Sequence, residues 1–274
     1  MTGYPTSIGT SDERSISVLG HDLARQLMGR VTFGELAFWL VAMRRPTRGE
    51  IRVFEAVLVA LADHGLTPSA IAARLTLTGA PESVQGALAA GLLGGGSRFL
   101  GVTEDAGRFL ATALAARTAA GGQLPTSSDG WDDVAREAVR TQRETHRYVP
   151  GLGHNIHRGG DPRTPALLRI AAEERLLGPH LRLFEAIGRV HHEILGRALP
   201  LNGAGACGAA LRDLGFPVDT LRGFALLART AGLLGHIAEE MRRPIGLDVY
   251  EHVGRATDYQ PPLPGLDDVE DDLD

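Results

Sequence analysis

The sequence predicts an all-α protein, and three observations support that prediction. Apolar residues recur at helical spacing in several long segments, and no stretch alternates apolar and polar residues as a half-buried strand does. Aromatic residues make up only 5% of the 274 residues. Hydrophobic residues make up 43%, which is typical of a chain that buries a core and excludes a disordered one.

Three helices are indicated by apolar stripes along one face. The first begins at about residue 51, the second spans about 182–199 and the third about 220–241. Other helix starts are predicted where a capping residue precedes proline, because proline lacks the N–H that the first turn leaves unpaired. These starts are Thr67–Pro68, Asp161–Pro162 and Thr164–Pro165.

Three segments look like connections or ends. Residues 92–99 contain three consecutive glycines between predicted helices, and residues 119–131 are rich in turn-forming residues, which suggests a linker or hinge. Residues 258–274 combine prolines with many acidic residues. We expect the end of this stretch to be a mobile tail, because it has no apolar face to pack.

Charge and cysteine content exclude several classes of protein. The net charge is −5 and the basic residues are scattered, which argues against a nucleic-acid partner. Cys207 is the single cysteine, so an intrachain disulfide and a cysteine-based zinc site are excluded, and we expect it to be packed. We find neither a signal-peptide pattern nor an apolar run of membrane-spanning length, so we expect a cytoplasmic protein.

Candidate site residues begin with His64, in the segment Ala-Asp-His-Gly at residues 62–65. It lies at a chain reversal, between one predicted helix and the next, where an imidazole can face a cleft. Taken alone, the segment favours a histidine that only caps or packs a helix end.

The second candidate segment is YVPGLGHNIHRGGDPR, residues 148–163. Gly151 and Gly153 have no Cβ, so backbone amides there can approach a flat or anionic ligand closely. His154 follows at the edge of that approach. Arg163 comes after a Gly-Gly turn and can offer a two-pronged fork to a carboxylate. His154 and His157 have no third ligand nearby in the sequence and form no HExxH motif, so we expect no metal.

The third candidate segment places two arginines, Arg229 and Arg243, at either end of an apolar helical stretch. This placement suggests a cleft-facing position, although an ordinary charged surface helix remains an alternative. The glycines at 203–208 form no GxGxxG or P-loop motif, and no GxSxG is present. A dinucleotide-binding fold and a serine hydrolase are therefore excluded.

Taken together and in this order, three segments resemble the aligned blocks of the citrate synthase superfamily. They are ADHG, PGLGHNIHRGGDPR and FALLARTAGLLGHIAEEMRRP. The resemblance covers about residues 20–246. A fourth segment, GLLGGGSRFLG, and the short N-terminal part are more similar to citryl-CoA lyases and to the lyase module of ATP-citrate lyase.

The resemblance implies a fold with a large helical domain, a smaller helical domain and an active-site cleft between them. Residues 15–104 and 222–262 would form the large domain, residues 105–221 the small one, and residues 263–274 the acidic tail. It also implies a homodimer with a shared active site and a small domain that closes over the large one. No bound cofactor is implied, because the coenzyme A thioester is a substrate.

The resemblance also implies a role for each matching residue. His154 would be catalytic and would hydrogen-bond the keto or alcohol oxygen of the four-carbon oxo acid. His64, Arg163 and Arg229 would hold its carboxylates, with Arg243 contributed by the partner subunit. The CoA adenine end would lie on the backbone of Val149, Pro150, Gly151, Leu152 and Gly153.

Two departures from the family pattern stand out. The histidine that polarises the thioester carbonyl in citrate synthases is matched by Leu100, or by Phe99 in a shifted register, and the lyase branch lacks it too. Ala204 occupies the position of the family's catalytic aspartate, which moves the proton at the thioester α-carbon. Such a group contributes about 10²–10⁴-fold in rate. Asp213 and Asp219 are the nearby carboxylates that the sequence offers instead.

The sequence leaves three functional hypotheses open. The first is a CoA-dependent carbon–carbon lyase or synthase, with cleavage of citryl-CoA to acetyl-CoA and oxaloacetate as the leading case. The second keeps this chemistry but changes the acyl-CoA and the 2-oxo acid, because residues 203–205 leave room where the carboxylate stood. The third is a non-catalytic paralogue that binds a CoA ester or a dicarboxylate.

Overall fold

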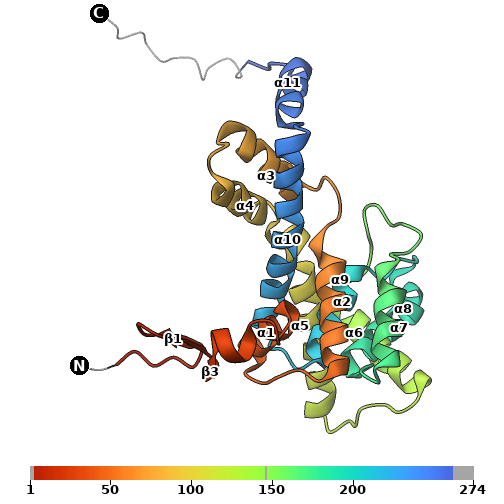
Figure 1. Ribbon diagram of the computed structural model, residues 1–274. Helices are drawn as coiled ribbons and strands as arrows, with labels where there is room; N and C mark the ends of the chain where they lie inside the picture. Colours follow the sequence, from red (N-terminus) through yellow and green to blue (C-terminus); the bar gives the residue numbers. More distant parts are fainter. Residues whose placement is uncertain (1–2, 146, 262–274) are drawn as a thin grey trace, which may run out of the picture.

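The computed structural model describes residues 3–145 and 147–261, and α-helices dominate this range (Figure 1). The helices are α1 (Phe33–Ala42), α2 (Arg48–Ala62), α3 (Pro68–Gly79), α4 (Val84–Leu93), α5 (Val102–Ala119), α6 (Ser128–Glu144), α7 (Arg163–Glu173), α8 (Pro179–Leu195), α9 (Gly203–Asp213), α10 (Leu221–Arg242) and α11 (Gly246–Ala256). The all-α prediction is confirmed.

Helix ends follow from capping chemistry. The helix expected from residue 51 begins at Arg48, because Thr47 and Glu50 form a capping box in which each side chain binds the other's backbone N–H. α3 begins at Pro68 behind the Thr67 cap, as predicted. The helix expected to run to residue 199 ends at Leu195, because Gly196 adopts a left-handed conformation (φ 69°) that stops it.

The expectation that the chain has no strands was wrong near the N-terminus. Three short antiparallel strands, β1 (Gly9–Ser11), β2 (Ile16–Val18) and β3 (His21–Asp22), pair in the order β1-β2-β3. They are two or three residues long, and none of their residues is buried. Such strands carry no alternating apolar pattern, and this explains why periodicity missed them.

The predicted connections lie between helices. The glycine triplet leads into η2 (Gly96–Leu100), a π-helical turn between α4 and α5, and residues 120–127 connect α5 to α6. Two further short turns are η1 (Leu23–Leu27) and η3 (Val218–Thr220). The predicted acidic tail, 263–274, lies outside the described residues.

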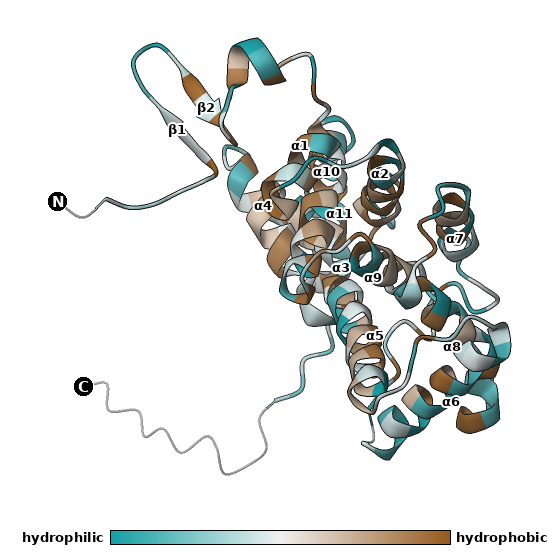
Figure 2. Cartoon of the chain, turned by 90° about the horizontal axis from the view of Figure 1, so that it is seen from below, coloured by the Kyte–Doolittle hydropathy of each residue, from teal (hydrophilic) through white to brown (hydrophobic). Residues whose placement is uncertain are grey.

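Two apolar clusters hold the helices together. The main core draws on α1, α2, α5–α9 and the first half of α10, with Phe54 and Phe184 among its fully buried side chains. The minor core joins α3, α4 and the second half of α10 around Leu233. In Figure 2, hydrophobic (brown) and hydrophilic (teal) residues are interspersed along the helices. The domain division at residues 105 and 221 stays a prediction.

The long helix α10 connects both cores and crosses the end of α2 (Figure 1). Gly232 of α10 lies so close to the backbone of Ala62 that no Cβ would fit there. This close approach brings the middle of α10, including Arg229, to the loop that follows α2 and carries His64. No helix in the described part of the chain is long and apolar enough to cross a bilayer.

Candidate functional site

Three imidazoles gather where the loop after α2 meets the loop before α7. The ring centroids of His64 and His154 are 5.2 Å apart, those of His64 and His157 are also 5.2 Å apart, and those of His154 and His157 are 4.5 Å apart. All three side chains are partly buried. In the sequence, about 90 residues separate His64 from the other two, so only the fold unites them.

The backbone fixes the orientation of the His154 ring. Its Nδ1 atom accepts hydrogen bonds from the backbone N–H groups of Ile156 (3.1 Å) and His157 (3.0 Å). Nδ1 therefore carries a lone pair, and in the neutral ring the proton is on Nε2. Burial lowers the pKa of His154, and the Asp161 carboxylate opposes this shift. His154 thus presents a neutral Nε2–H, which can donate to an oxygen.

His64 and His157 contact each other directly, with 3.1 Å between their Nε2 atoms. At this distance one Nε2 donates and the other accepts. Burial lowers the pKa of His64, and the positive charge of Arg163 lowers it further. The pair therefore offers the site one N–H donor and one lone pair.

The three rings lie close enough together to hold a metal ion, since one nitrogen from each lies within 4.8 Å of the others. A metal needs a lone pair from each ring, and the lone pair of His154 at Nδ1 is already turned to two backbone N–H groups. The charges of Arg163 and Arg229 also disfavour a cation next to His64. The arrangement suits an anion or a polar oxygen better than a metal.

Arg163 forms a bidentate ion pair with Asp161. Its Nε and Nη2 donate to the two carboxylate oxygens (3.0 and 2.7 Å), and Nη1 donates to the carbonyl of Ala60 (3.0 Å). The Asp161 side chain is 0% exposed and also accepts the N–H of Gly203 (2.7 Å). Burial opposes ionisation of Asp161, but these hydrogen bonds outweigh it and hold its pKa well below the usual range. The fork of Arg163 is thus already filled by Asp161 in this structure.

Arg229 has very different surroundings. It is only 7% exposed, yet its Nε and Nη1 atoms have no hydrogen-bond partner among the described residues. The nearest carboxylate oxygen recorded, on Asp63, lies 3.8 Å from Nη1 and belongs to a side chain that is 48% exposed. Burial lowers the pKa of Arg229. A buried cation with free donors is suited to bind an anion.

A polar chain holds Asp63 in place beside this arginine. Asp63 accepts the N–H of Gly65 (2.9 Å), and its other oxygen lies 2.9 Å from Nε2 of His236. Nε of Arg74 in turn donates to Nδ1 of His236 (3.3 Å). The sequence indicated Asp161 only as a capping residue and gave no site role to Asp161 or His236, because nothing in their local pattern distinguishes them from ordinary polar residues.

The predicted CoA-binding segment, Val149–Gly153, forms a tight turn against α9. Gly151 (φ 88°) packs against the Phe184 ring and the backbone of Gly205, which leaves no room for a Cβ. The N–H of Leu152 donates to Val149 and that of Gly153 to Pro200, so these two amides are occupied within the chain. Packing thus accounts for Gly151, and the CoA contact stays a prediction.

Ala204 lies in the first turn of α9, behind the Asn202 cap. Asp213 is at the other end of this helix, about 14 Å away at 1.5 Å per residue. Asp213 also caps α8 and contacts His180 (2.8 Å). Asp219 is 85% exposed and pairs with Arg108. The two carboxylates that the sequence offered as substitutes are therefore engaged elsewhere.

Arg243 is the C-cap residue directly after α10, and its exposed side chain lies outside the histidine cluster. It follows Arg229 by fourteen positions along this helix and its cap, which corresponds to about 20 Å. Its own chain therefore does not deliver Arg243 to the cluster. The contribution of this arginine by a partner subunit stays a prediction.

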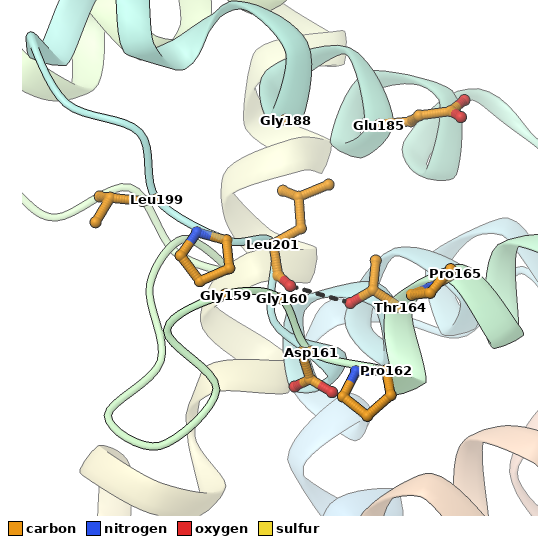
Figure 3. Close-up of a pocket in the computed structure, with 11 residues that line it drawn as sticks. Gly159, Gly160, Asp161, Pro162, Thr164, Pro165, Glu185, Gly188, Leu199 and Leu201 are labelled. Carbon is orange, nitrogen blue, oxygen red and sulfur yellow. Dashed lines mark hydrogen bonds between the residues drawn. The ribbon is translucent and has the colours of Figure 1, made fainter.

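A pocket of about 530 Å³ lies between the loop before α7 and helix α8 (Figure 3). Thr164 closes one side by donating its hydroxyl to the carbonyl of Leu201 (3.2 Å). The ionisable residues that line the pocket, Asp161 and Glu185, are both acidic. This pocket therefore does not suit an anionic ligand, in contrast to the surroundings of Arg229.

The chain is similar to known proteins over most of its length. A family model described as citrate synthase, C-terminal domain, matches residues 10–246. The structure of citryl-CoA lyase from Hydrogenobacter thermophilus is 30% identical, with a TM-score of 0.80 over 95% of this chain and 96% of that one. ATP citrate lyase from Methanothrix soehngenii, in complex with citrate and coenzyme A, is 24% identical, with a TM-score of 0.75 over 96% of this chain and 42% of that one.

A curated relative, 2-methylcitrate synthase 1 of Corynebacterium glutamicum, is 27% identical over 200 residues, which is 70% of this chain and 46% of that protein. The chain spans between 23% and 46% of the length of the curated relatives that it matches. The likeness to citryl-CoA lyase, by contrast, extends over nearly the whole of both chains.

Proposed function

The chain belongs to the citrate synthase family, and on that premise we propose that it is a CoA-dependent carbon–carbon lyase or synthase of the citryl-CoA lyase type. The proposed reaction is cleavage of citryl-CoA to acetyl-CoA and oxaloacetate, or its reverse. We also propose a cytoplasmic homodimer in which Arg243 enters the partner's site.

One observation carries the proposal: His64, His154 and Arg229 come from distant segments and gather beside the Asp161–Arg163 pair. The pKa values of both histidines are lowered by burial, and the charge of Arg163 contributes to each shift. Neutral imidazoles beside a buried guanidinium suit a ligand that carries carboxylates around a polar oxygen. Oxaloacetate and the citryl group both have this chemistry.

Each side chain then has a defined task. The Nε2–H of His154 donates to the oxygen that is a hydroxyl in citryl-CoA and a ketone in oxaloacetate, and it stabilises negative charge there during cleavage. The free donors of Arg229 hold a carboxylate with charge-assisted hydrogen bonds. The Asp161–Arg163 ion pair holds the loop that carries His154 in place. His64 supplies a further donor to the carboxylates.

A second candidate is supported by Ala204. Without the family's aspartate, a chain with this site can bind a CoA ester or a dicarboxylate and fail to turn it over. In that case, calorimetry would detect binding of citryl-CoA, with no acetyl-CoA formed.

The direct test replaces His154 with alanine. The His154→Ala variant should lose acetyl-CoA release from citryl-CoA by at least about 10²-fold, because the oxygen loses its positioned donor. His252→Ala is a matched control, since His252 is exposed on α11 and remote from the cluster in the chain. Equal rates in the wild type and His154→Ala would defeat the proposed mechanism.

A further inference from the structure

The proposed lyase reaction needs a group that moves a proton, and the usual aspartate is replaced by Ala204. Cleavage removes the proton of the citryl hydroxyl and later adds a proton to the methylene carbon, which becomes the methyl group of acetyl-CoA. The replacement group must therefore reach the oxygen held by His154 and the carbon two bonds away from it. This inference rests on the proposed function.

The carboxylates around the described site are unsuited to this task. Asp161 is buried, bound to Arg163 and to the N–H of Gly203, and its pKa is held far below that of a useful base. Asp63 is engaged with His236 and the N–H of Gly65. Asp213 and Asp219 are committed to His180 and Arg108.

Two of the three histidines are also assigned by their contacts. His154 has its lone pair turned to the backbone, so its Nε2 donates and does not accept. His64 lies next to the charges of Arg163 and Arg229, where a donor to a carboxylate is required. With His64 as the donor in the Nε2–Nε2 contact, the lone pair belongs to His157.

We infer that Nε2 of His157 is the group that takes the hydroxyl proton of the substrate and returns it to the methylene carbon. One nitrogen from each of His157 and His154 lies within 4.8 Å of the other, so a single oxygen can contact both rings. His157 is partly buried and is carried by the same loop as His154, which fixes their relative positions. A substrate hydroxyl between them replaces the His64–His157 contact of the free protein.

The reaction is balanced with the His157 imidazole as its only proton carrier. The hydroxyl proton passes to Nε2 of His157, and the O–H electron pair forms the ketone of oxaloacetate. The bond between the carbinol carbon and the methylene carbon breaks, and its electron pair passes to the thioester enolate. The imidazolium of His157 then gives its Nε2 proton to the methylene carbon, so acetyl-CoA is released and His157 is neutral again.

The test is a double-mutant cycle between His157 and Ala204, measured as acetyl-CoA formed from citryl-CoA by the full-length protein. His157→Gln should lower the rate by about 10²–10⁴-fold, the usual contribution of a positioned acid/base group. The dissociation constant for citryl-CoA should change by less than tenfold. His192→Gln, an exposed position on α8, is the control for a general histidine effect.

The second arm restores the aspartate. Ala204→Asp should raise the rate at least tenfold in the His157→Gln background. In the wild type it should change the rate only a few-fold, because His157 already transfers the proton there. A simple structural role for His157 would not produce this rescue.

Each other outcome overturns the inference. If His157→Gln retains the wild-type rate, His157 is not the proton shuttle, although the proposed lyase function survives. If binding and rate fall together and Ala204→Asp gives no rescue, the role of His157 is structural. If the wild type binds citryl-CoA without forming acetyl-CoA, both the inference and the proposed function fail.

Discussion

Arg163 and Arg229 lie close to the same histidines, but their surroundings differ. Every recorded donor contact of Arg163 ends on protein oxygen, in the Asp161 carboxylate or the Ala60 carbonyl. Arg229 is more buried than Arg163, with a side chain 9% exposed against 22%, and has two donor atoms without a hydrogen-bond partner among the described residues. The Arg163 guanidinium is neutralised by a carboxylate of its own chain. The free donor atoms of Arg229 are instead available to a ligand.

This difference indicates that the two arginines serve different purposes, Arg163 the stability of the fold and Arg229 the binding of a ligand. A buried charge that is paired and hydrogen-bonded helps to fix the fold, and removal of its partner is costly. A buried charge with free donors costs free energy in the unliganded protein, and a ligand recovers that free energy. We therefore expect substitutions around Arg163 to act mainly on folding and substitutions of Arg229 to act mainly on ligand affinity.

The largest expected effect is that of Asp161→Asn. The substitution keeps the size of the side chain but leaves Arg163 without a counter-charge, which should lower the free energy of unfolding by about 3 kcal/mol. This is the low end of the cost of breaking a buried pair, because the Arg163 side chain keeps 22% exposure. Urea unfolding at pH 7 measures it.

Asp219→Asn is the control, since it removes an exposed partner of Arg108 and should change the unfolding free energy by less than about 1 kcal/mol. Equal effects at the two positions would mean that the Asp161–Arg163 pair does not stabilise the fold.

A smaller effect, of a different kind, is expected for Arg229→Gln. Oxaloacetate should bind about 10- to 100-fold more weakly, because a hydrogen bond to a charged group contributes about 1.5–3 kcal/mol. The unliganded protein should lose no stability, because the substitution removes a buried charge that has two free donor atoms and whose counter-charge, on the half-exposed Asp63, lies 3.8 Å away. Calorimetry and urea unfolding together measure both quantities.

Arg222→Gln tests the specificity of that result. Arg222 lies on the same helix but pairs with Glu104, so its loss should leave oxaloacetate affinity unchanged. A comparison in which both variants weaken binding equally would show that Arg229 acts through net charge alone.

The smallest expected effect is a change in acid stability. The pKa of Asp161 is lower in the folded protein than in the unfolded chain, so its stabilising contribution is present above the unfolded pKa of about 4 and is lost as the pH falls further. The lowered pKa values of His64 and His154 act in the same direction below about pH 6.5. The advantage of the wild type over Asp161→Asn should therefore shrink between pH 5 and pH 3, and a constant difference would contradict this account.

Much of the fold followed from the sequence because periodicity and capping are local. Thr67 with Pro68 predicted the start of α3, and the stripe over residues 220–241 predicted α10 within one residue at either end. The strands at residues 9–22 were not predicted because they are only two or three residues long and bury no side chain, so they leave no alternating apolar pattern. The early end of α8 was not predicted, because the left-handed conformation of Gly196 cannot be distinguished in the sequence from that of any other glycine.

The site was less predictable, because its geometry depends on contacts between distant segments. The sequence singled out His64, His154, Arg163 and Arg229 but could not show that Asp161 already occupies the fork of Arg163. It also gave a different reason for Gly151, which the structure explains by packing against Phe184. His157 was considered only as a metal ligand, since nothing local indicates its contact with His64.

The most direct measurement is a crystal structure of the protein with oxaloacetate and a CoA ester. We expect one carboxylate on the free donors of Arg229, the keto oxygen within hydrogen-bonding distance of Nε2 of His154, and the Asp161–Arg163 pair unchanged. An oxo acid bound away from these two residues, or density only in the acidic pocket between Asp161 and Glu185, would contradict the assignment.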